Sequence, residues 1–182
     1  MRLFIAFDVS EEVKHYLIEL QKQLPKDSKL NLVKEFHQTL KFLGDVDEDK
    51  VDKIKASLTN VNFIKFTAKT DGIGVFPDEK MIRVVWVGLE PKDKIVALQQ
   101  EIESALLEMF PKDNRFHPHL TLARVKSIKD KKDFIKKLNK LTIKEIKFPV
   151  SSFKLIKSTL TPEGSVYGDV AEFALNPQLT QK

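Results

Sequence analysis

Two of the four histidines in this sequence stand in the same four-residue pattern, His-x-Thr-Leu. The first copy begins at His37 and the second at His119. An imidazole has an unperturbed pKa of about 6.5, so at neutral pH it can either donate or accept a proton. Two imidazoles in matching contexts predict a single site that needs one proton donor and one proton acceptor.

Each motif also carries a hydroxyl group, from Thr39 and from Thr121. On a strand, residues two apart leave the same face about 7 Å from each other, so each threonine could contact the group that its histidine contacts. Threonine is also a common strand residue, but its recurrence at the same offset favours a binding role. In-line displacement at phosphorus requires a base, an acid and donors for the equatorial oxygens. The two motifs supply this set without a metal.

Strand alternation predicts which other side chains share the face of the first motif. It places Lys41 beside His37 and Thr39, where the amine could neighbour a substrate. It turns Leu40 and Phe42 toward the opposite face, where they would anchor the strand in the core.

The same rule applied to the second motif places Ala123 on the face of His119 and Thr121. It places Arg124 on the opposite face, with Leu120. A guanidinium group binds phosphate oxygens in a bidentate manner, so Arg124 is a candidate substrate contact. It can serve only if the strand bends or ends before it.

A metal site is the main alternative use of these histidines. His117 and His119 form a His-x-His pair, which could bind zinc together with His37. Pro118 between the pair, and the threonines of the repeated motif, argue against this arrangement. A metallohydrolase therefore stays as a rival hypothesis.

Composition narrows the class of protein. A chain of 182 residues buries roughly 70% of its unfolded surface, which is enough for a sizeable core. The absence of cysteine excludes disulfides, thiol nucleophiles and cysteine-ligated metal centres. No apolar run approaches the roughly 20 residues that span a bilayer, and the chain opens with a strand pattern. We expect a soluble, cytoplasmic protein.

The net charge points to an anionic partner. The 31 lysines and arginines exceed the 26 acidic residues, which gives a formal charge of +5 and a pI near 9.2. A basic surface of this kind suits RNA. A chain rich in lysine and glutamate without cysteine is also typical of heat-adapted proteins, and the two explanations are compatible.

The repetition extends beyond the motifs, at an offset of about 81 residues. Each half reads as a strand, a helix, the motif strand, a second helix and a pair of strands. The matching segments are 2–9 with 82–89, 10–24 with 93–110, 47–59 with 130–141, and 63–76 with 145–158. We predict repeat halves at about 1–80 and 81–175 within a single two-lobed domain that spans 1–182.

These residues resemble the 2H phosphoesterases, a family named for two His-x-Ser/Thr-x motifs, and within it the RNA 2',3'-cyclic phosphodiesterases, also called 2'-5' RNA ligases. The resemblance covers nearly the whole chain and is carried by residues 3–7, 37–44, 74–77, 83–88 and 116–124. It implies an α+β fold of two pseudo-symmetric lobes. Each lobe would be an antiparallel sheet with packed helices, and the motifs would meet in the cleft between them.

The resemblance also implies a reaction, the opening of a 2',3'-cyclic phosphate at an RNA end to leave a 2'-phosphate, without metal or cofactor. On that pattern His37 donates a proton to the leaving 3' oxygen and His119 accepts one from water. Thr39 and Thr121 would bind the phosphate, with support from Arg124. The reverse reaction would join a cyclic phosphate to a 5'-hydroxyl and form a 2'-5' linkage.

The expected partners are RNA ends that carry a cyclic phosphate, tRNA fragments among them, bound by a monomer. Phe76 and Tyr167 could stack on a nucleobase, although core packing is the more common use of such rings. Whether a nucleotide triphosphate occupies the cleft stays open. A second rival hypothesis is an RNA-binding module whose histidines turn over no substrate.

Overall fold

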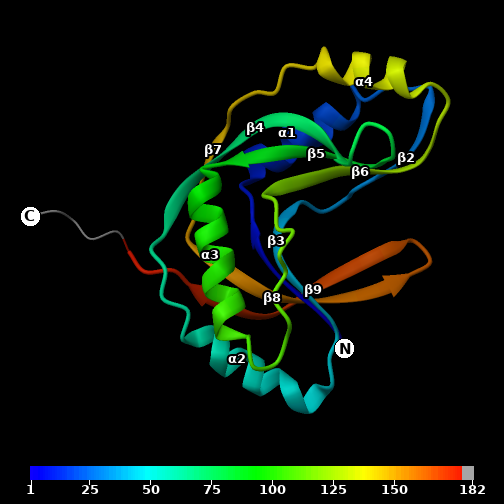
Figure 1. The fold of residues 1–182 in the computed structure, drawn as a ribbon. Coiled ribbons are helices and arrows are strands. Elements are labelled where there is room, and N and C mark those ends of the chain that lie inside the picture. The colour runs from blue at the N-terminus through cyan, green and yellow to red at the C-terminus, as the bar shows by residue number, and fades with distance from the viewer. Residues whose placement is uncertain (178–182) are drawn as a thin grey trace, which may run out of the picture.

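The computed structural model describes residues 1–177 and shows an α+β fold of two antiparallel sheets and four α-helices within that range (Figure 1). None of the described helices is long and apolar enough to cross a membrane. In chain order the elements are β1 (Arg2–Asp8), α1 (Glu11–Gln21), β2 (Ser28–Leu32), β3 (His37–Asp45), a 3-10 turn (Glu48–Lys50), α2 (Val51–Thr59), β4 (Phe66–Pro77), β5 (Ile82–Glu90), α3 (Lys92–Ala105), β6 (His119–Ile128), α4 (Lys131–Asn139), β7 (Lys147–Val150), β8 (Ser152–Thr161) and β9 (Gly164–Ala174).

The strands form two sheets, which we call sheet A and sheet B. Sheet A has the order β3-β1-β8-β9, and sheet B has the order β2-β6-β5-β4-β7. Figure 1 shows the two sheets diverging from the side where α3 lies, with α4 over sheet B and α2 beside sheet A. The expected fold class, antiparallel sheets with packed helices, is confirmed.

The pairing of the central strands joins distant parts of the chain. In sheet A, β1 pairs with β3 and also with β8, which lies near the other end of the sequence. In sheet B, β5 pairs with β6 and with β4. Each sheet therefore contains strands from both predicted halves. Segment 63–76, expected to be a pair of strands, instead contains one long strand, β4, which continues to Pro77.

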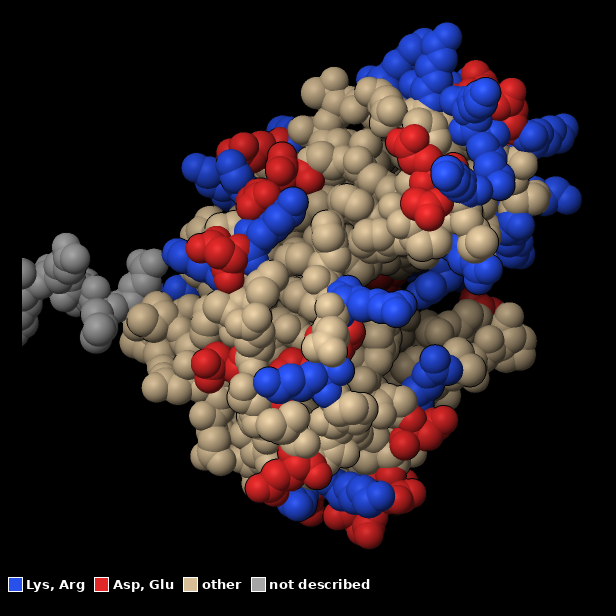
Figure 2. Space-filling view, in the orientation of Figure 1, with Lys and Arg blue, Asp and Glu red and all other residues tan. Residues whose placement is uncertain are grey.

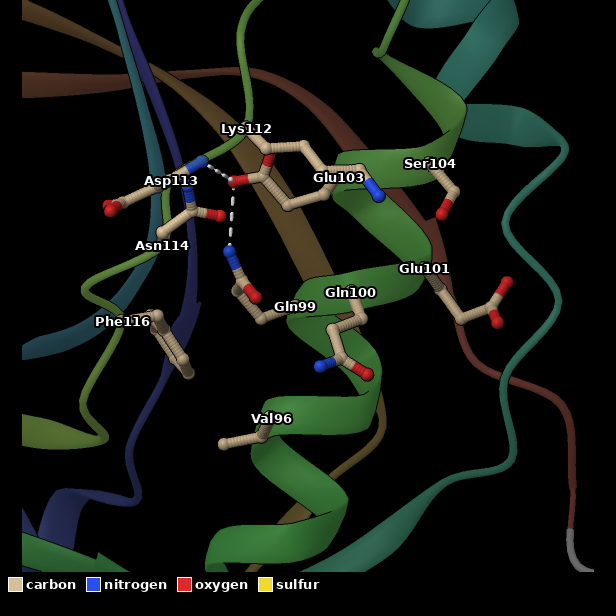
Figure 3. Close-up of a pocket in the computed structure, with 10 residues that line it drawn as sticks. All are labelled: Val96, Gln99, Gln100, Glu101, Glu103, Ser104, Lys112, Asp113, Asn114 and Phe116. Atoms are coloured by element: carbon tan, nitrogen blue, oxygen red, sulfur yellow. Dashed lines mark hydrogen bonds between the residues drawn. The ribbon is translucent and has the colours of Figure 1, made fainter.

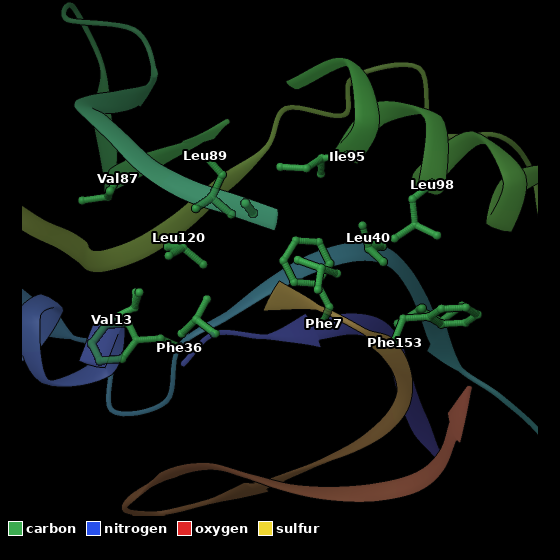
Figure 4. Close-up of a cluster of buried hydrophobic side chains, with 14 of the residues drawn as sticks. Phe7, Val13, Phe36, Leu40, Val87, Leu89, Ile95, Leu98, Leu120 and Phe153 are labelled. Atoms are coloured by element: carbon green, nitrogen blue, oxygen red, sulfur yellow. The ribbon is translucent and has the colours of Figure 1, made fainter. Parts of the chain in front are cut away.

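The larger of two clusters of buried apolar side chains in the described residues fills the space between the sheets and the helices (Figure 4), and the smaller one consists of Phe4, Ala6 and Ile156 on sheet A. Helix α1 shows how the sequence builds it, because Val13, Leu17 and Leu20 recur at helical spacing and are buried. Ser10 caps this helix by accepting a hydrogen bond from the Val13 N–H at 3.3 Å. Burial of each such side chain contributes about 1.5 to 3 kcal/mol, so the core holds both sheets in one unit.

A β-bulge interrupts the first motif strand. Thr39 pairs with Ala6, and Lys41 pairs with the preceding residue Ile5, so Leu40 is the extra residue. Leu40 and Lys41 are consequently both buried, and Phe42 is 70% exposed. The expected faces of Lys41 and Phe42 were wrong, because strict alternation does not hold across a bulge.

The second motif strand contains the same irregularity at Leu122. Thr121 pairs with Trp86 and Ala123 pairs with Val85, and both Leu122 and Ala123 are fully buried. The bulge turns the exposed Arg124 onto the face of His119. The expected faces of Ala123 and Arg124 were therefore wrong, and the geometric objection to Arg124 as a site residue disappears.

Candidate active site

The two motifs meet through the side chain of Gln38, which is fully buried. Its Oε1 accepts a hydrogen bond from the backbone N–H of His119 at 2.6 Å, and its Nε2 donates one to the carbonyl of Thr39 at 2.6 Å. Strand β2 pairs with β6 only from Ala123 onward, so the His119 N–H has no strand partner on that side. Gln38 supplies this partner and brings the motif strands of sheets A and B together.

The ring of His119 is held in one orientation. Its Nδ1 lies 2.6 Å from the backbone carbonyl oxygen of His117. Because a carbonyl only accepts, Nδ1 carries the proton, and a neutral ring leaves Nε2 as a proton acceptor. Burial lowers the pKa of His119 below its ordinary value and the charge of Arg124 adds to this, while the bond to His117 acts in the opposite direction. The neutral ring therefore dominates at neutral pH.

The ring of His37 lies in an aromatic environment on sheet A. It packs against Phe4, with ring centroids 4.9 Å apart, and meets Tyr167 edge-to-face at 5.2 Å. Burial lowers the pKa of His37 to about 4, opposed by the carboxylate of Asp8 and reinforced by Lys14. In the free site this imidazole is neutral at pH 7.

A second aromatic group surrounds His119 on sheet B. Phe76 meets the imidazole edge-to-face with centroids 4.9 Å apart, and it packs on Trp86 at the same separation. Gly74 makes room for the indole, since a Cβ at this position would lie 2.3 Å from Trp86 Cζ2. Phe76 and Tyr167, whose roles the sequence left open, are thus half-buried rings packed against the two motif histidines.

Lys41 forms a buried ion pair instead of facing a substrate (Figure 3 shows Glu103 and its neighbours). Its Nζ donates to Glu103 Oε2 at 2.7 Å and to the Pro111 carbonyl at 2.8 Å. Glu103 Oε1 accepts bonds from Gln99 Nε2 at 2.9 Å and from the Asp113 N–H at 3.2 Å. The pair fastens α3 and the start of the segment leading into β6 to β3, so it supports His119 indirectly.

Two pockets lie near these elements. One of about 300 Å³ opens beside His37, between the start of α1 and β9; its lining includes Asp8, Lys14, Phe36 and Tyr167. The larger, of about 510 Å³, lies between α3 and residues 112–116 and contains neither motif (Figure 3). The smaller pocket therefore borders the candidate site at His37, and the second motif lies outside its lining.

The structure does not assemble a metal centre from the candidate ligands. Among residues 1–177, no three His, Asp or Glu side chains are grouped as a metal site requires. The rings of His117 and His119 lie 6.4 Å apart, and Nδ1 of His117 is buried without a hydrogen-bond partner among the described residues. The set of His37, His117 and His119, which the sequence left as a rival hypothesis, is not among the groupings found.

The other predicted site residues lie on the two motif strands. His37 and Thr39 are on β3, and His119, Thr121 and Arg124 are on β6. Sequence reasoning missed the function of Gln38, although a polar residue at a core-facing strand position was a usable signal. It also missed the exposed position of Phe42, because nothing in the local pattern marks the bulge.

Comparisons with known proteins agree on the family. Residues 10–161 match the 2'-5' RNA ligase superfamily. The chain is 38% identical to the RNA 2',3'-cyclic phosphodiesterase of Methanocaldococcus jannaschii, over 95% of this chain and 100% of that protein. It resembles the crystal structure of TT0787 of Thermus thermophilus (TM-score 0.79, 27% identity, 98% of this chain and 100% of that one). E. coli LigT complexed with 3'-AMP gives a TM-score of 0.73 at 25% identity, covering 96% of this chain and 97% of that one. The chain belongs to the 2'-5' RNA ligase superfamily.

Proposed function

We propose that the protein is a metal-independent RNA 2',3'-cyclic phosphodiesterase. The observation that carries the proposal is the approach of the two motif strands, which the bond between Gln38 and the His119 N–H fixes. The name of the M. jannaschii relative supports the substrate class, and the 3'-AMP complex of LigT supports a nucleotide phosphate as ligand.

In the proposed reaction, water attacks the phosphorus of the cyclic diester and Nε2 of His119 accepts its proton. The bond between phosphorus and the 3' oxygen breaks, and protonated His37 gives its proton to that oxygen. The products are a 2'-phosphate and a free 3'-hydroxyl. Thr39, Thr121 and Arg124 stabilise the equatorial oxygens, which gain negative charge in the transition state.

The lowered pKa of His37 fits this role once substrate is bound. In the free site burial favours the neutral ring. A phosphate anion beside the imidazole favours the protonated form instead. Substrate binding therefore supplies the charge that prepares His37 to act as an acid.

In the proposed ligation a 5'-hydroxyl takes the place of water, loses its proton to His119 and attacks the cyclic phosphate, and the 3' oxygen leaves with a proton from His37, which forms a 2'-5' linkage. Hydrolysis dominates in water unless the second RNA end is held in position. We further propose a cytoplasmic monomer that acts on RNA ends with a cyclic phosphate, including those of tRNA fragments.

The test is turnover of adenosine 2',3'-cyclic phosphate with identification of the product. We expect the 2'-phosphate, full activity in a chelator, and a loss of roughly 10² to 10⁴ in turnover for His37→Ala and for His119→Ala. Binding without turnover would support the RNA-binding module. Activity lost in a chelator and restored by zinc would support the metallohydrolase.

A further inference from the structure

We propose that Lys154 is a positioning residue for the acid His37, because it binds the carboxylates of Asp8 and Asp169 beside that imidazole and limits their effect on it. The inference rests on the proposed function, since only a catalytic His37 gives this arrangement a consequence for turnover. It adds to that function a control of the pH range and of the charge that an anionic substrate meets.

The strand pairing of sheet A places Asp8 and Lys154 on the face of His37. Asp8 on β1 pairs directly with His37 on β3, and directly opposed residues of antiparallel strands project from the same face, with Cα atoms about 4.5 to 5.5 Å apart. Lys154 on β8 lies opposite Ala6, two residues before Asp8, so it projects from that face as well. The pairing therefore brings the carboxylate of Asp8 next to the imidazole of His37.

Lys154 binds two carboxylates at once. Its Nζ lies 2.7 Å from Oδ2 of Asp169 and 2.8 Å from Oδ2 of Asp8. The lysine side chain is only 18% exposed, so it is held between its partners instead of extending into solvent. The bonds to Asp169 and Asp8 raise the pKa of Lys154. The amine therefore keeps its charge from acidic to well above neutral pH.

The cluster reaches the ring of His37 through β9. Asp169 follows Tyr167 by two residues on that strand, so the two side chains share a face. Tyr167 in turn meets His37 edge-to-face at 5.2 Å. Asp8, His37, Tyr167 and Asp169 also line the same pocket of about 300 Å³. All four strands of sheet A thus contribute to one polar cluster around the acid.

Other charged or titratable side chains face His37 from α1 and from the segment before β3. These line the same pocket and are Glu11, Lys14, His15, Lys34 and Glu35. Burial has the largest influence on the pKa of His37 and lowers it, the charge of Asp8 raises it, and the charge of Lys14 lowers it. Of these three influences, Asp8 is the one that favours the protonated acid, and Lys154 is its bound partner.

The bond between Lys154 and Asp8 has two consequences. A cation at 2.8 Å offsets much of the field of the carboxylate, so it weakens the support that Asp8 gives to protonated His37. The same cation offsets the repulsion that Asp8 and Asp169 exert on a phosphate anion. Lys154 therefore lowers the protonated fraction of the acid and favours binding of an anionic substrate.

The surroundings of the cluster offer little other charge to replace Lys154. Figure 2 shows basic side chains gathered over α4 and the nearby ends of β2 and β6, and mostly uncharged surface on the β8–β9 hairpin across the hollow. Among residues 1–177, Asp8 and Asp169 form no ion pair with a second cation. Loss of Lys154 would therefore leave two carboxylates beside the site without a bound cation.

The first test is an NMR titration of the histidine side chains in the free protein, with His37→Gln used to assign the signal of His37. We expect Lys154→Met to raise the pKa of His37 by roughly 0.5 to 1, the effect of a unit charge a few ångströms away in a partly solvated site. Asp169→Asn should lower this pKa, because Lys154 then binds Asp8 alone. Lys154→Gln gives the same comparison if methionine disturbs the fold.

A double-mutant cycle tests whether Lys154 acts through Asp8. We expect Lys154→Met to change the pKa of His37 much less in the Asp8→Asn background than in the wild type, since the charge that the lysine offsets is then absent. An equal change in both backgrounds would show that Lys154 acts on His37 directly, and would refute the positioning role.

Lys137 provides the matched control, because it too is bound by two aspartates. Its Nζ lies 2.7 Å from Asp133 and 3.2 Å from Asp27. It projects from α4 and lies outside the lining of the pocket at His37. Lys137→Met should leave both the pKa of His37 and KM unchanged.

The second test measures KM for adenosine 2',3'-cyclic phosphate at low and at high salt. At about 0.01 M salt, where charges act over about 30 Å, we expect Lys154→Met to raise KM roughly 2- to 5-fold. Near 1 M salt, where that range falls to about 3 Å, the difference should largely disappear. An unchanged KM at low salt would refute the effect on substrate binding.

The outcomes separate this inference from the proposed function. The NMR titration requires no turnover, so an unchanged pKa of His37 in Lys154→Met refutes the inference even if the enzyme is active. If this pKa rises as expected but the wild type turns over no cyclic phosphate, the proposed function falls. In that case the charge coupling stands and the role of Lys154 in turnover is refuted.

Discussion

The buried amide of Gln38 connects the first motif to the backbone of His119, 2.6 Å from its N–H. Gln38→Met keeps the length of the side chain and removes both hydrogen bonds. A freed N–H lets the second motif shift, and a displacement of about 1 Å can cost 10²-fold in rate. We expect kcat to fall roughly 10- to 100-fold while KM changes little, as measured by steady-state kinetics.

Thr70 provides the matched control for that variant. It is buried, donates to the Lys144 carbonyl at 2.7 Å and accepts from the Ile146 N–H at 2.9 Å. Thr70→Val should destabilise the fold by about 1 to 3 kcal/mol, as should Gln38→Met, and should leave kcat unchanged. Equal losses of kcat in the two variants would mean that Gln38 acts through stability alone.

The pKa values predict activity that declines as the solution becomes alkaline. The reactive form needs protonated His37 and neutral His119. Because the pKa of His37 in the free site is about 4, its protonated fraction falls tenfold per pH unit well above that value, while the lowered pKa of His119 leaves that ring mostly neutral at pH 7 and above. We expect kcat/KM, which reports on the free enzyme, to fall about tenfold per unit between pH 7 and 9.

Asp8 offers a way to check the origin of that decline. Its carboxylate raises the pKa of His37, so Asp8→Asn should move the decline toward lower pH. A profile of kcat/KM that stays flat from pH 7 to 9 would exclude His37 as the acid with the environment described here.

Arg124 should contribute to catalysis, although strict strand alternation predicted that it faces away from His119. We expect Arg124→Ala to lower kcat/KM roughly 10- to 100-fold, the range for a hydrogen bond to a charged group. Arg124→Lys should recover only part of the loss, since an amine cannot bind two oxygens side by side. Val84 lies directly opposite Arg124, so the neighbouring Arg83 projects from the other face. Arg83→Ala should be kinetically silent, and an equal effect of both alanine variants would contradict the assigned geometry.

The ion pair of Lys41 and Glu103 should matter for stability. Removing one partner leaves the other charge buried, which costs about 3 to 5 kcal/mol. We expect Lys41→Met and Glu103→Leu each to lower the free energy of unfolding by about that amount in urea denaturation. The double variant should recover most of the loss, because an apolar pair of similar volume has no charge to desolvate. Additive losses would show that the two side chains act independently.

Local sequence patterns predicted which strands carry the site better than they predicted which face of the strand each side chain occupies. The spacing of His37, Thr39, His119 and Thr121 was enough to place each pair on one side of its strand. A β-bulge directly after each motif threonine moved Phe42 and Arg124 to the face opposite the predicted one. A bulge depends on how the strand pairs with β1 or β5, and the motif sequence carries no information about that pairing. In the first motif, Lys41 was predicted to face solvent because a lysine is rarely buried without a partner. That partner, Glu103, is 62 residues away.

Pairing between Leu3 and Lys157 has a consequence for synthesis of the chain. As the nascent polypeptide leaves the ribosome, β1 exposes Leu3, Ile5 and Phe7 beside an open strand edge until β8 has been translated. Unpaired apolar edges invite aggregation. A truncated product that stops before β8 should therefore be insoluble, and a frameshift late in the gene would abolish the protein as completely as an early one.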